Sequence, residues 1–275
     1  MVAKFSKGGE MNSISISNLR AFSALALCAA LSACVTQTSV ESKLPDQAAK
    51  SDGNHRATIH TERAAEYYRL GNLPIALEAT QAAIEANPKH PPAHNMQGIV
   101  YVGLGEFAKA QTAYETALKL APNDSETLNN LGWFICERQS PAKAMPYFEQ
   151  ALKNTLYATP ERALYNTGLC ARKMGDADKA ETMMQSTLQR QPGFAPALFQ
   201  LADMQFSSGR MKDAEAYLTR YNKLTTNPTI EALFLGARIA RALNDRAGED
   251  SYIQQLRRRF PDATQTRLAQ ELRAR

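Results

Sequence analysis

Apolar residues follow two different patterns along this chain of 275 residues. Near the amino end, an uncharged run extends from Ala21 to Cys34. From residue 57 onward, apolar residues recur with helical spacing, and the same order of small and large side chains returns every 34 residues. Between the two, residues 35–56 are polar and lack periodicity, which predicts a flexible segment.

The uncharged run is too short to cross a membrane. Its 14 residues would span about 21 Å as a helix, whereas a bilayer core of about 30 Å needs about 20 apolar residues. Arg20 before the run and small residues before Cys34 are typical of a secretory signal, so residues 1–33 are expected to be cleaved. Residues 1–10 fit a signal poorly, and translation from Met11 is an alternative start.

The stretch Leu31-Ser32-Ala33-Cys34 resembles the bacterial lipobox, whose cysteine is acylated and becomes the new N-terminus. The resemblance implies that Cys34 carries lipid and that residues 34–56 tether the protein to a membrane. Val35 follows the cysteine, where an aspartate would favour the inner membrane, so we expect the periplasmic face of the outer membrane. The alternative is an ordinary signal peptide with a chance cysteine.

The second pattern is clearest in residues 91–124. Counted from the first residue, Gly98 and Ala110 stand at positions 8 and 20, Tyr114 at position 24 and Pro122 at position 32. This order resembles the tetratricopeptide repeat, a helix–turn–helix unit of about 34 residues. Small residues let the two antiparallel helices cross closely, large residues fill the space around the crossing, and proline ends the second helix.

Six units share this register and predict an all-α, superhelical tetratricopeptide-repeat solenoid. The last two units depart most, because Tyr221 and Gln255 replace the small residue at position 27 and Phe260 stands where proline is expected. Solenoid ends need a polar cover, so residues 263–275 are expected to form a capping helix. The units span residues 57–90, 91–124, 125–158, 161–194, 195–228 and 229–262, with Thr159 and Pro160 inserted after the third.

Apolar side chains at the concave positions of the first helices predict a groove that binds a partner peptide. A row of exposed apolar side chains is costly unless something covers it. The alternative is that these residues pack on neighbouring turns. Four asparagines (Asn95, Asn129, Asn130, Asn166) resemble those of a carboxylate-binding groove, but its lysine is missing, so that variant is not expected. The groove residues are Tyr68, Ile99, Val102, Trp133, Tyr165, Leu169, Phe199 and Phe206.

The net charge of the chain and its lack of known catalytic motifs argue against nucleic-acid binding and enzymatic activity. The formal net charge of +5 is too small to predict nucleic-acid binding. The chain has no glycine-rich phosphate loop, no nucleophile elbow and no Cys/His cluster with the spacing of a zinc site. We therefore expect no enzymatic activity, no cofactor, no metal and no small-molecule substrate.

Cys136 and Cys170 remain once the signal peptide is removed and Cys34 is acylated. They fall in the first helices of the third and fourth units, which are neighbours in the stack, in a compartment that permits disulfides. We expect a disulfide between them. The alternatives are two buried thiols that behave as small apolar residues and a redox pair, which normally has CxxC spacing at a helix start.

Three stretches are similar to the PilF/PilW family of type IV pilus biogenesis lipoproteins: residues 128–136 (LNNLGWFIC), 155–170 (TLYATPERALYNTGLC) and 235–261 (LGARIARALNDRAGEDSYIQQLRRRFP). The resemblance implies an outer-membrane pilotin that binds the type IV pilus secretin and promotes its localisation and multimerisation, supporting pili and twitching motility. The first two units, through Tyr68, Ile99 and Val102, are the expected secretin site because they lie nearest the anchor. A general periplasmic adaptor for envelope or peptidoglycan enzymes would share the lipobox and the repeats, and it is the alternative.

Overall fold

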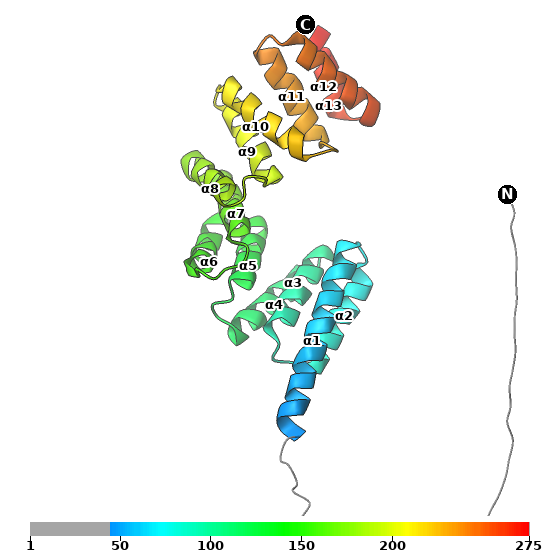
Figure 1. Ribbon diagram of the computed structural model, residues 1–275, viewed down its shortest axis with the longest axis vertical. Helices are drawn as coiled ribbons and strands as arrows, with labels where there is room; N and C mark the ends of the chain where they lie inside the picture. Colours follow the sequence, from blue (N-terminus) through cyan, green and yellow to red (C-terminus); the bar gives the residue numbers. More distant parts are fainter. Residues whose placement is uncertain (1–44, 275) are drawn as a thin grey trace, which may run out of the picture. The chain divides into compact units, whose positions relative to one another are not determined.

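The computed structural model describes residues 45–274, and within that range all regular structure is helical. Successive helices form antiparallel pairs, and each pair packs on the next (Figure 1). The helices are α1 (Pro45–Arg69), α2 (Leu73–Ala86), α3 (Pro91–Gly103), α4 (Phe107–Leu120), α5 (Ser125–Arg138), α6 (Pro141–Lys153), α7 (Pro160–Lys173), α8 (Ala177–Arg190), α9 (Ala195–Ser207), α10 (Met211–Leu224), α11 (Ile230–Ala242), α12 (Arg246–Arg259) and α13 (Thr264–Ala274).

Close crossing of the two helices in a unit depends on the small residue at position 8. A Cβ atom placed on Gly98 would lie 2.6 Å from the Tyr114 ring, and one on Gly132 would lie 2.9 Å from the Phe148 ring. Phe148 is fully buried at this crossing. A larger side chain at position 8 would push the helices apart and open a cavity around the ring.

Helix α1 begins earlier than expected, which corrects the predicted flexible segment. Residues 45–56 belong to α1, so only residues 34–44 of the predicted tether are outside it, and these lie outside the described residues, as does Cys34. The small residues Gly53 and Ala57 are buried where α1 packs on α2, and Asn87 donates a hydrogen bond to Asn54. The apolar pattern does not predict this contact, because the buried face consists of small residues rather than large apolar ones.

The residue in the turn between the helices of a unit adopts a left-handed conformation in five units. Gly71, Gly105, Gly175 and Gly209 have φ angles of 76 to 79°, and Asn244 has a φ angle of 61°. Gly209 follows Gly175 by 34 residues, but Asn244 follows Gly209 by 35. The extra residue lies in the linker before α11, which starts at residue 230.

This insertion corrects the register of the sixth unit, which begins at Ile230 rather than at residue 229. Pro261 then occupies position 32, where sequence analysis had placed Phe260. Likewise, Ala237 rather than Gly236 stands at position 8. The sixth unit therefore follows the consensus at its end more closely than the sequence analysis expected.

In the corrected register, a buried charge replaces the alanine found at position 20 of the first five units. Glu249 is 4% exposed. Its carboxylate lies 3.4 Å from Nη1 of Arg241 and 3.8 Å from Nε of Arg273. Arg273 belongs to α13, where a capping helix was expected, so this ion pair ties that helix to the sixth unit. None of the helices within residues 45–274 is long and apolar enough to cross a membrane.

Candidate protein-binding pocket

A pocket at the first three units brings together four side chains that sequence analysis assigned to the groove. Tyr68 from α1, Ile99 and Val102 from α3 and Trp133 from α5 line a cavity of about 370 Å³. The first helices of neighbouring units pack against one another, which places these residues side by side. Ile99 and Val102 share one face of α3 because residues three apart are neighbours on a helix.

Two aromatic residues, Tyr114 and Phe134, complete the apolar part of this pocket. Their ring centroids lie 6.1 Å apart, and both side chains are buried. Burial raises the pKa of the Tyr114 phenol well above its usual value, so the phenol is neutral at physiological pH. The inner wall of the pocket is therefore an uncharged, closely packed surface.

The rim of the pocket is polar, and its two charged side chains, Glu137 and Arg138, both have partners within the chain. Glu137 Oε1 lies 2.5 Å from Lys173 Nζ, which also stands 5.7 Å from the centre of the Trp133 ring. The guanidinium carbon of Arg138 lies 3.9 Å from the centre of the Phe107 ring. An apolar centre inside a polar rim is the usual anatomy of a protein interface.

The pocket is also lined by Asn130, Glu137 and Arg138, which are not among the predicted groove residues. Asn130 and Glu137 lie three residues before and four residues after Trp133, on the same face of α5. Extending the prediction by one helical turn on either side of Trp133 would have identified both.

The other predicted groove residues do not line this pocket. Tyr165, Leu169 and Phe199 are half-buried and pack against the core of the fourth to sixth units, as does Phe206. The Tyr165 ring lies 5.1 Å from the Phe194 ring, and the Phe199 ring lies 5.9 Å from the Tyr221 ring. These four residues therefore follow the alternative expectation, in which the side chain packs on neighbouring turns of the solenoid.

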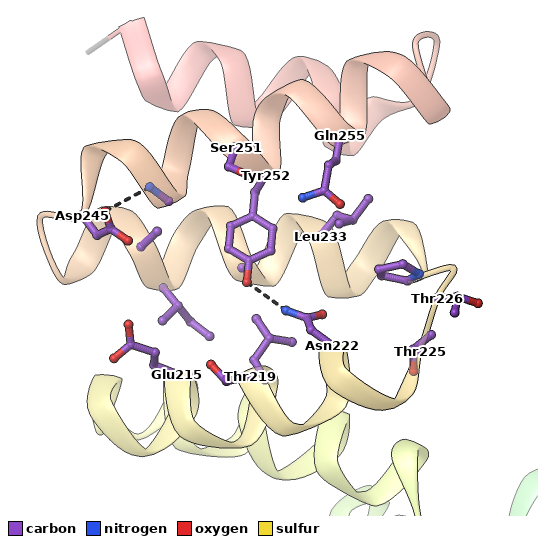
Figure 2. A pocket seen from close by; sticks show the side chains of 16 residues that line it. Glu215, Thr219, Asn222, Thr225, Thr226, Leu233, Asp245, Ser251, Tyr252 and Gln255 are labelled. Atoms are coloured by element: carbon purple, nitrogen blue, oxygen red, sulfur yellow. Dashed lines mark hydrogen bonds between the residues drawn. The ribbon is translucent and has the colours of Figure 1, made fainter.

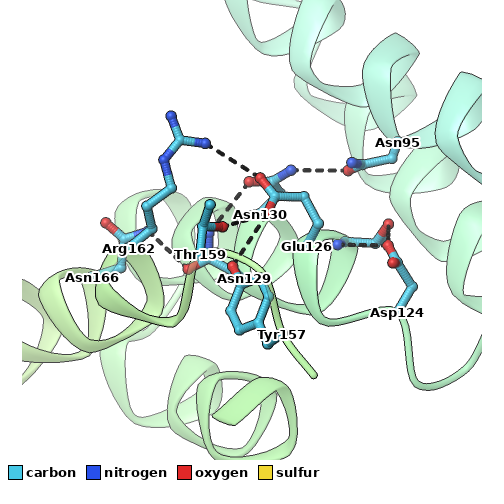
Figure 3. A network of polar contacts seen from close by, with 10 residues as sticks. Asn95, Asp124, Glu126, Asn129, Asn130, Tyr157, Thr159, Arg162 and Asn166 are labelled. Carbon is cyan, nitrogen blue, oxygen red and sulfur yellow. Dashed lines mark hydrogen bonds and ion pairs between the residues drawn. The ribbon is translucent and has the colours of Figure 1, made fainter. Parts of the chain in front are cut away.

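The four asparagines form hydrogen bonds between first helices (Figure 3). Asn130 Nδ2 donates to Asn95 Oδ1 at 3.0 Å, which joins α5 to α3. Asn166 Nδ2 donates to Asn129 Oδ1 at 2.9 Å, which joins α7 to α5. Their amide groups therefore position the helices that carry the pocket.

The linker that contains the two-residue insertion is held by one carboxylate (Figure 3). Glu126 accepts hydrogen bonds from the Tyr157 hydroxyl at 3.2 Å, from Thr159 Oγ1 at 3.1 Å and from Arg162 Nη1 at 3.4 Å. Tyr157 is buried, whereas Leu156 beside it is 89% exposed. The loop that contains the insertion is therefore fixed to α5 by hydrogen bonds.

Cys136 on α5 and Cys170 on α7 are both buried, and in the structure a disulfide joins them. Their Cα atoms lie 6.0 Å apart, within the range that a disulfide requires. The third and fourth units are therefore linked covalently next to the pocket. Among the described residues, no group of three or more His, Cys, Asp or Glu side chains could hold a metal ion.

Comparison with known proteins identifies the repeat and its relatives. Two models of the tetratricopeptide repeat match residues 95–161 and residues 171–233, which confirms the expected fold. The type IV pilus assembly protein PilF of Pseudomonas aeruginosa is 26% identical over 195 residues, which are 71% of this chain and 77% of that protein.

Two solved structures resemble this one. The crystal structure of PilW, described as a widely conserved type IV pilus biogenesis factor, is 33% identical with a TM-score of 0.70, and the match covers 77% of this chain and 97% of that chain. The structure of Pseudomonas aeruginosa PilF has a TM-score of 0.73 at 24% identity, covering 81% of this chain and 98% of that chain. At that identity, the second match supports the fold alone.

Proposed function

The chain belongs to the family of type IV pilus biogenesis proteins that includes PilW and PilF, and on this premise we propose that it is a secretin pilotin. In this proposal, lipid on Cys34 anchors the protein to the periplasmic face of the outer membrane. The repeats bind the type IV pilus secretin and promote its localisation and multimerisation there. The chain acts by binding, without catalysis.

The apolar pocket of the first three units is the observation that carries this proposal. Tyr68 is 37% exposed at its edge, and Ile99, Val102 and Trp133 are half-buried, so their apolar surface is available to a partner. Burying a large apolar side chain contributes about 1.5–3 kcal/mol. Tyrosine and tryptophan are frequent hot spots of protein interfaces. A secretin segment that inserts one or two apolar side chains matches a cavity of about 370 Å³.

The position of the pocket in the chain also supports the proposal. Tyr68 stands near the end of α1, the first described helix after the proposed lipid anchor. The pocket is thus built by the units nearest to that anchor in sequence. A pilotin that holds its secretin through these units would keep the bound segment close to the outer membrane.

The double variant Ile99→Asp, Tyr68→Ala tests the site. A carboxylate in the apolar pocket and a lost aromatic ring should abolish secretin multimers in the outer membrane, measured by electrophoresis of unboiled membranes. Helical circular dichroism and membrane attachment should stay unchanged, because neither residue belongs to the fully buried core. A matched control is Leu224→Asp, Tyr217→Ala, which changes the same kinds of residue away from the pocket.

The control should assemble secretin normally. If the double variant in the pocket also assembled secretin at wild-type levels, the pocket of the first three units would not be the secretin site. If the wild-type protein failed to recover secretin from envelope membranes, the pilotin proposal itself would be wrong.

A further inference from the structure

The junction between the fifth and sixth units departs from the repeat in two ways. Position 27 of the fifth unit holds Tyr221, where the first three units hold Ala83, Ala117 and Ala151. Tyr221 is buried, and the linker that follows α10 is one residue longer than the linker that follows α8. This junction therefore differs from the preceding one in the size of its contact residue and in the length of its linker. Departures from a local rule often mark functional sites.

A crevice of about 550 Å³ occupies this junction, lined by α10, α11 and α12 (Figure 2). Leu218, Leu233 and Ile239 form its apolar floor. The Tyr252 ring projects into it from α12, and the Tyr252 hydroxyl accepts a hydrogen bond from Asn222 Nδ2 at 3.0 Å. This arrangement would accommodate an aliphatic stem with a polar end.

Two carboxylates, Glu215 and Asp245, line the crevice, and none of the described residues that line it is lysine or arginine. Just outside the crevice, Lys212 Nζ lies 3.4 Å from Glu215 Oε2, but the Lys212 side chain is 79% exposed. Burial raises the pKa of the Tyr252 phenol, and Glu215 and Asp245 raise it further. The two carboxylates therefore create a negative potential at the Tyr252 side chain. Asp245 is held in place, because its Oδ1 accepts a hydrogen bond from the Gly248 backbone at 3.0 Å.

The preceding junction contains an internal ion pair at the corresponding place. Between the fourth and fifth units, Arg210 Nη2 lies 2.7 Å from Glu181 Oε2, and the Arg210 guanidinium also donates a hydrogen bond to Gln205. In the aligned units, Glu215 stands at the position of Glu181, and Asp245 stands at the position of Arg210. The junction between the fifth and sixth units thus keeps the acidic residue, Glu215, but has a second carboxylate, Asp245, where the preceding junction has Arg210.

We propose that the crevice between α10 and α12 binds an arginine side chain of a partner protein, which occupies the place that Arg210 takes at the preceding junction. The methylene groups of this arginine would lie on Leu218 and Ile239, and its guanidinium would pair with Glu215 and Asp245. The crevice involves none of the residues of the pocket around Trp133. It is therefore a second protein-binding site, and it does not depend on the pilotin proposal.

The test compares two synthetic pentapeptides that differ in one residue. Both have blocked ends and alanine at four positions, and the central residue is arginine or the neutral isostere citrulline. Nuclear magnetic resonance titration of the labelled full chain in detergent micelles should place the arginine peptide at the amides of Gly248, Ser251 and Tyr252. The citrulline peptide should bind at least tenfold more weakly. Equal affinity of the two peptides, or shifts centred on Tyr68 and Trp133 instead, would overturn the proposal.

Variants of the crevice give a second measurement. Glu215→Gln with Asp245→Asn removes both charges, and asparagine keeps the helix cap that Asp245 provides. Affinity for the arginine peptide should fall at least tenfold. The control Glu78→Gln with Glu85→Gln changes net charge equally on α2 and should leave the affinity unchanged.

Asp245→Arg tests the comparison with Arg210 directly. The introduced guanidinium should pair with Glu215 as Arg210 pairs with Glu181, so the crevice would be occupied from within. Binding of the arginine peptide should then be abolished while the helical circular dichroism remains. Unchanged peptide affinity in this variant would show that the crevice does not bind arginine as proposed.

Discussion

Gly98 on α3 lies directly against the ring of Tyr114 on α4, and a Cβ atom at residue 98 would stand 2.6 Å from that ring. Tyr114 also lines the pocket that contains Ile99 and Val102. The close crossing of α3 and α4 therefore also fixes the position of the Tyr114 ring in the wall of the candidate binding pocket. A change at Gly98 should affect both the stability of the fold and the shape of this pocket.

Gly98→Ala should destabilise the protein by about 1–3 kcal/mol, because the Tyr114 ring must move to accommodate the added methyl group. Urea unfolding followed by circular dichroism measures the change. The matched control is Gly193→Ala, whose Cβ would meet only Leu224, at 4.0 Å, and which should change stability by no more than about 0.5 kcal/mol. Equal unfolding midpoints for the two variants would contradict the steric argument.

The disulfide between Cys136 and Cys170 should stabilise the fold. We expect reduction to lower the free energy of unfolding by about 2–4 kcal/mol, mainly because the link restricts the unfolded chain. Thermal unfolding with and without reductant measures this. In the variant Cys136→Ala with Cys170→Ala, the midpoint should not respond to reductant.

The state of the two cysteines can be measured directly. Labelling the mature protein with a thiol reagent, after unfolding without reductant, should detect no free thiol at either residue. Two labelled cysteines would show that the third and fourth units are held together without a covalent link.

The sequence predicted most of the fold because the repeat is constrained by sterics that few residues satisfy. Gly98 and Gly132 must be small where large rings cross them, so the register of the early units can be read directly. The sixth unit was placed one residue too early because its position 20 is a buried glutamate, Glu249, instead of alanine. Pro261 was the available signal, and an inserted linker residue concealed it.

The candidate site could be predicted only in part. Helical periodicity places a side chain on one face of its own helix, but the neighbouring helices decide whether that face is open. Tyr165 packs on Phe194, the residue before α9, and Phe199 packs on Tyr221 of α10. Trp133 also packs against a core cluster, but part of its side chain lines the pocket. No pattern within one helix distinguishes these two outcomes.

Lipidation of Cys34 remains a prediction, since that residue lies outside the described part of the chain. Intact mass of the purified mature protein should correspond to a chain that begins at Cys34 and carries acyl groups. One acyl chain binds a membrane only marginally, whereas two or more anchor a protein stably. Cys34→Ser should therefore give a folded protein that is released from the outer membrane, and a mature mass without lipid would contradict the anchor.

Tyr157 should make the stability of the protein depend on alkaline pH. Its burial, together with the Glu126 carboxylate, raises the pKa of the phenol above the value of about 10 expected in the unfolded chain. The neutral phenol therefore stabilises the fold fully below about pH 10, and this contribution is lost as the pH rises through the folded-state pKa. Tyr157→Phe removes this titration together with the hydrogen bond to Glu126, at a cost of about 0.5–1.5 kcal/mol near pH 8. Between pH 8 and pH 11, the urea midpoint of Tyr157→Phe should fall less than that of the wild type. Equal falls for Tyr157→Phe and the wild type would show that Tyr157 does not couple folding to pH.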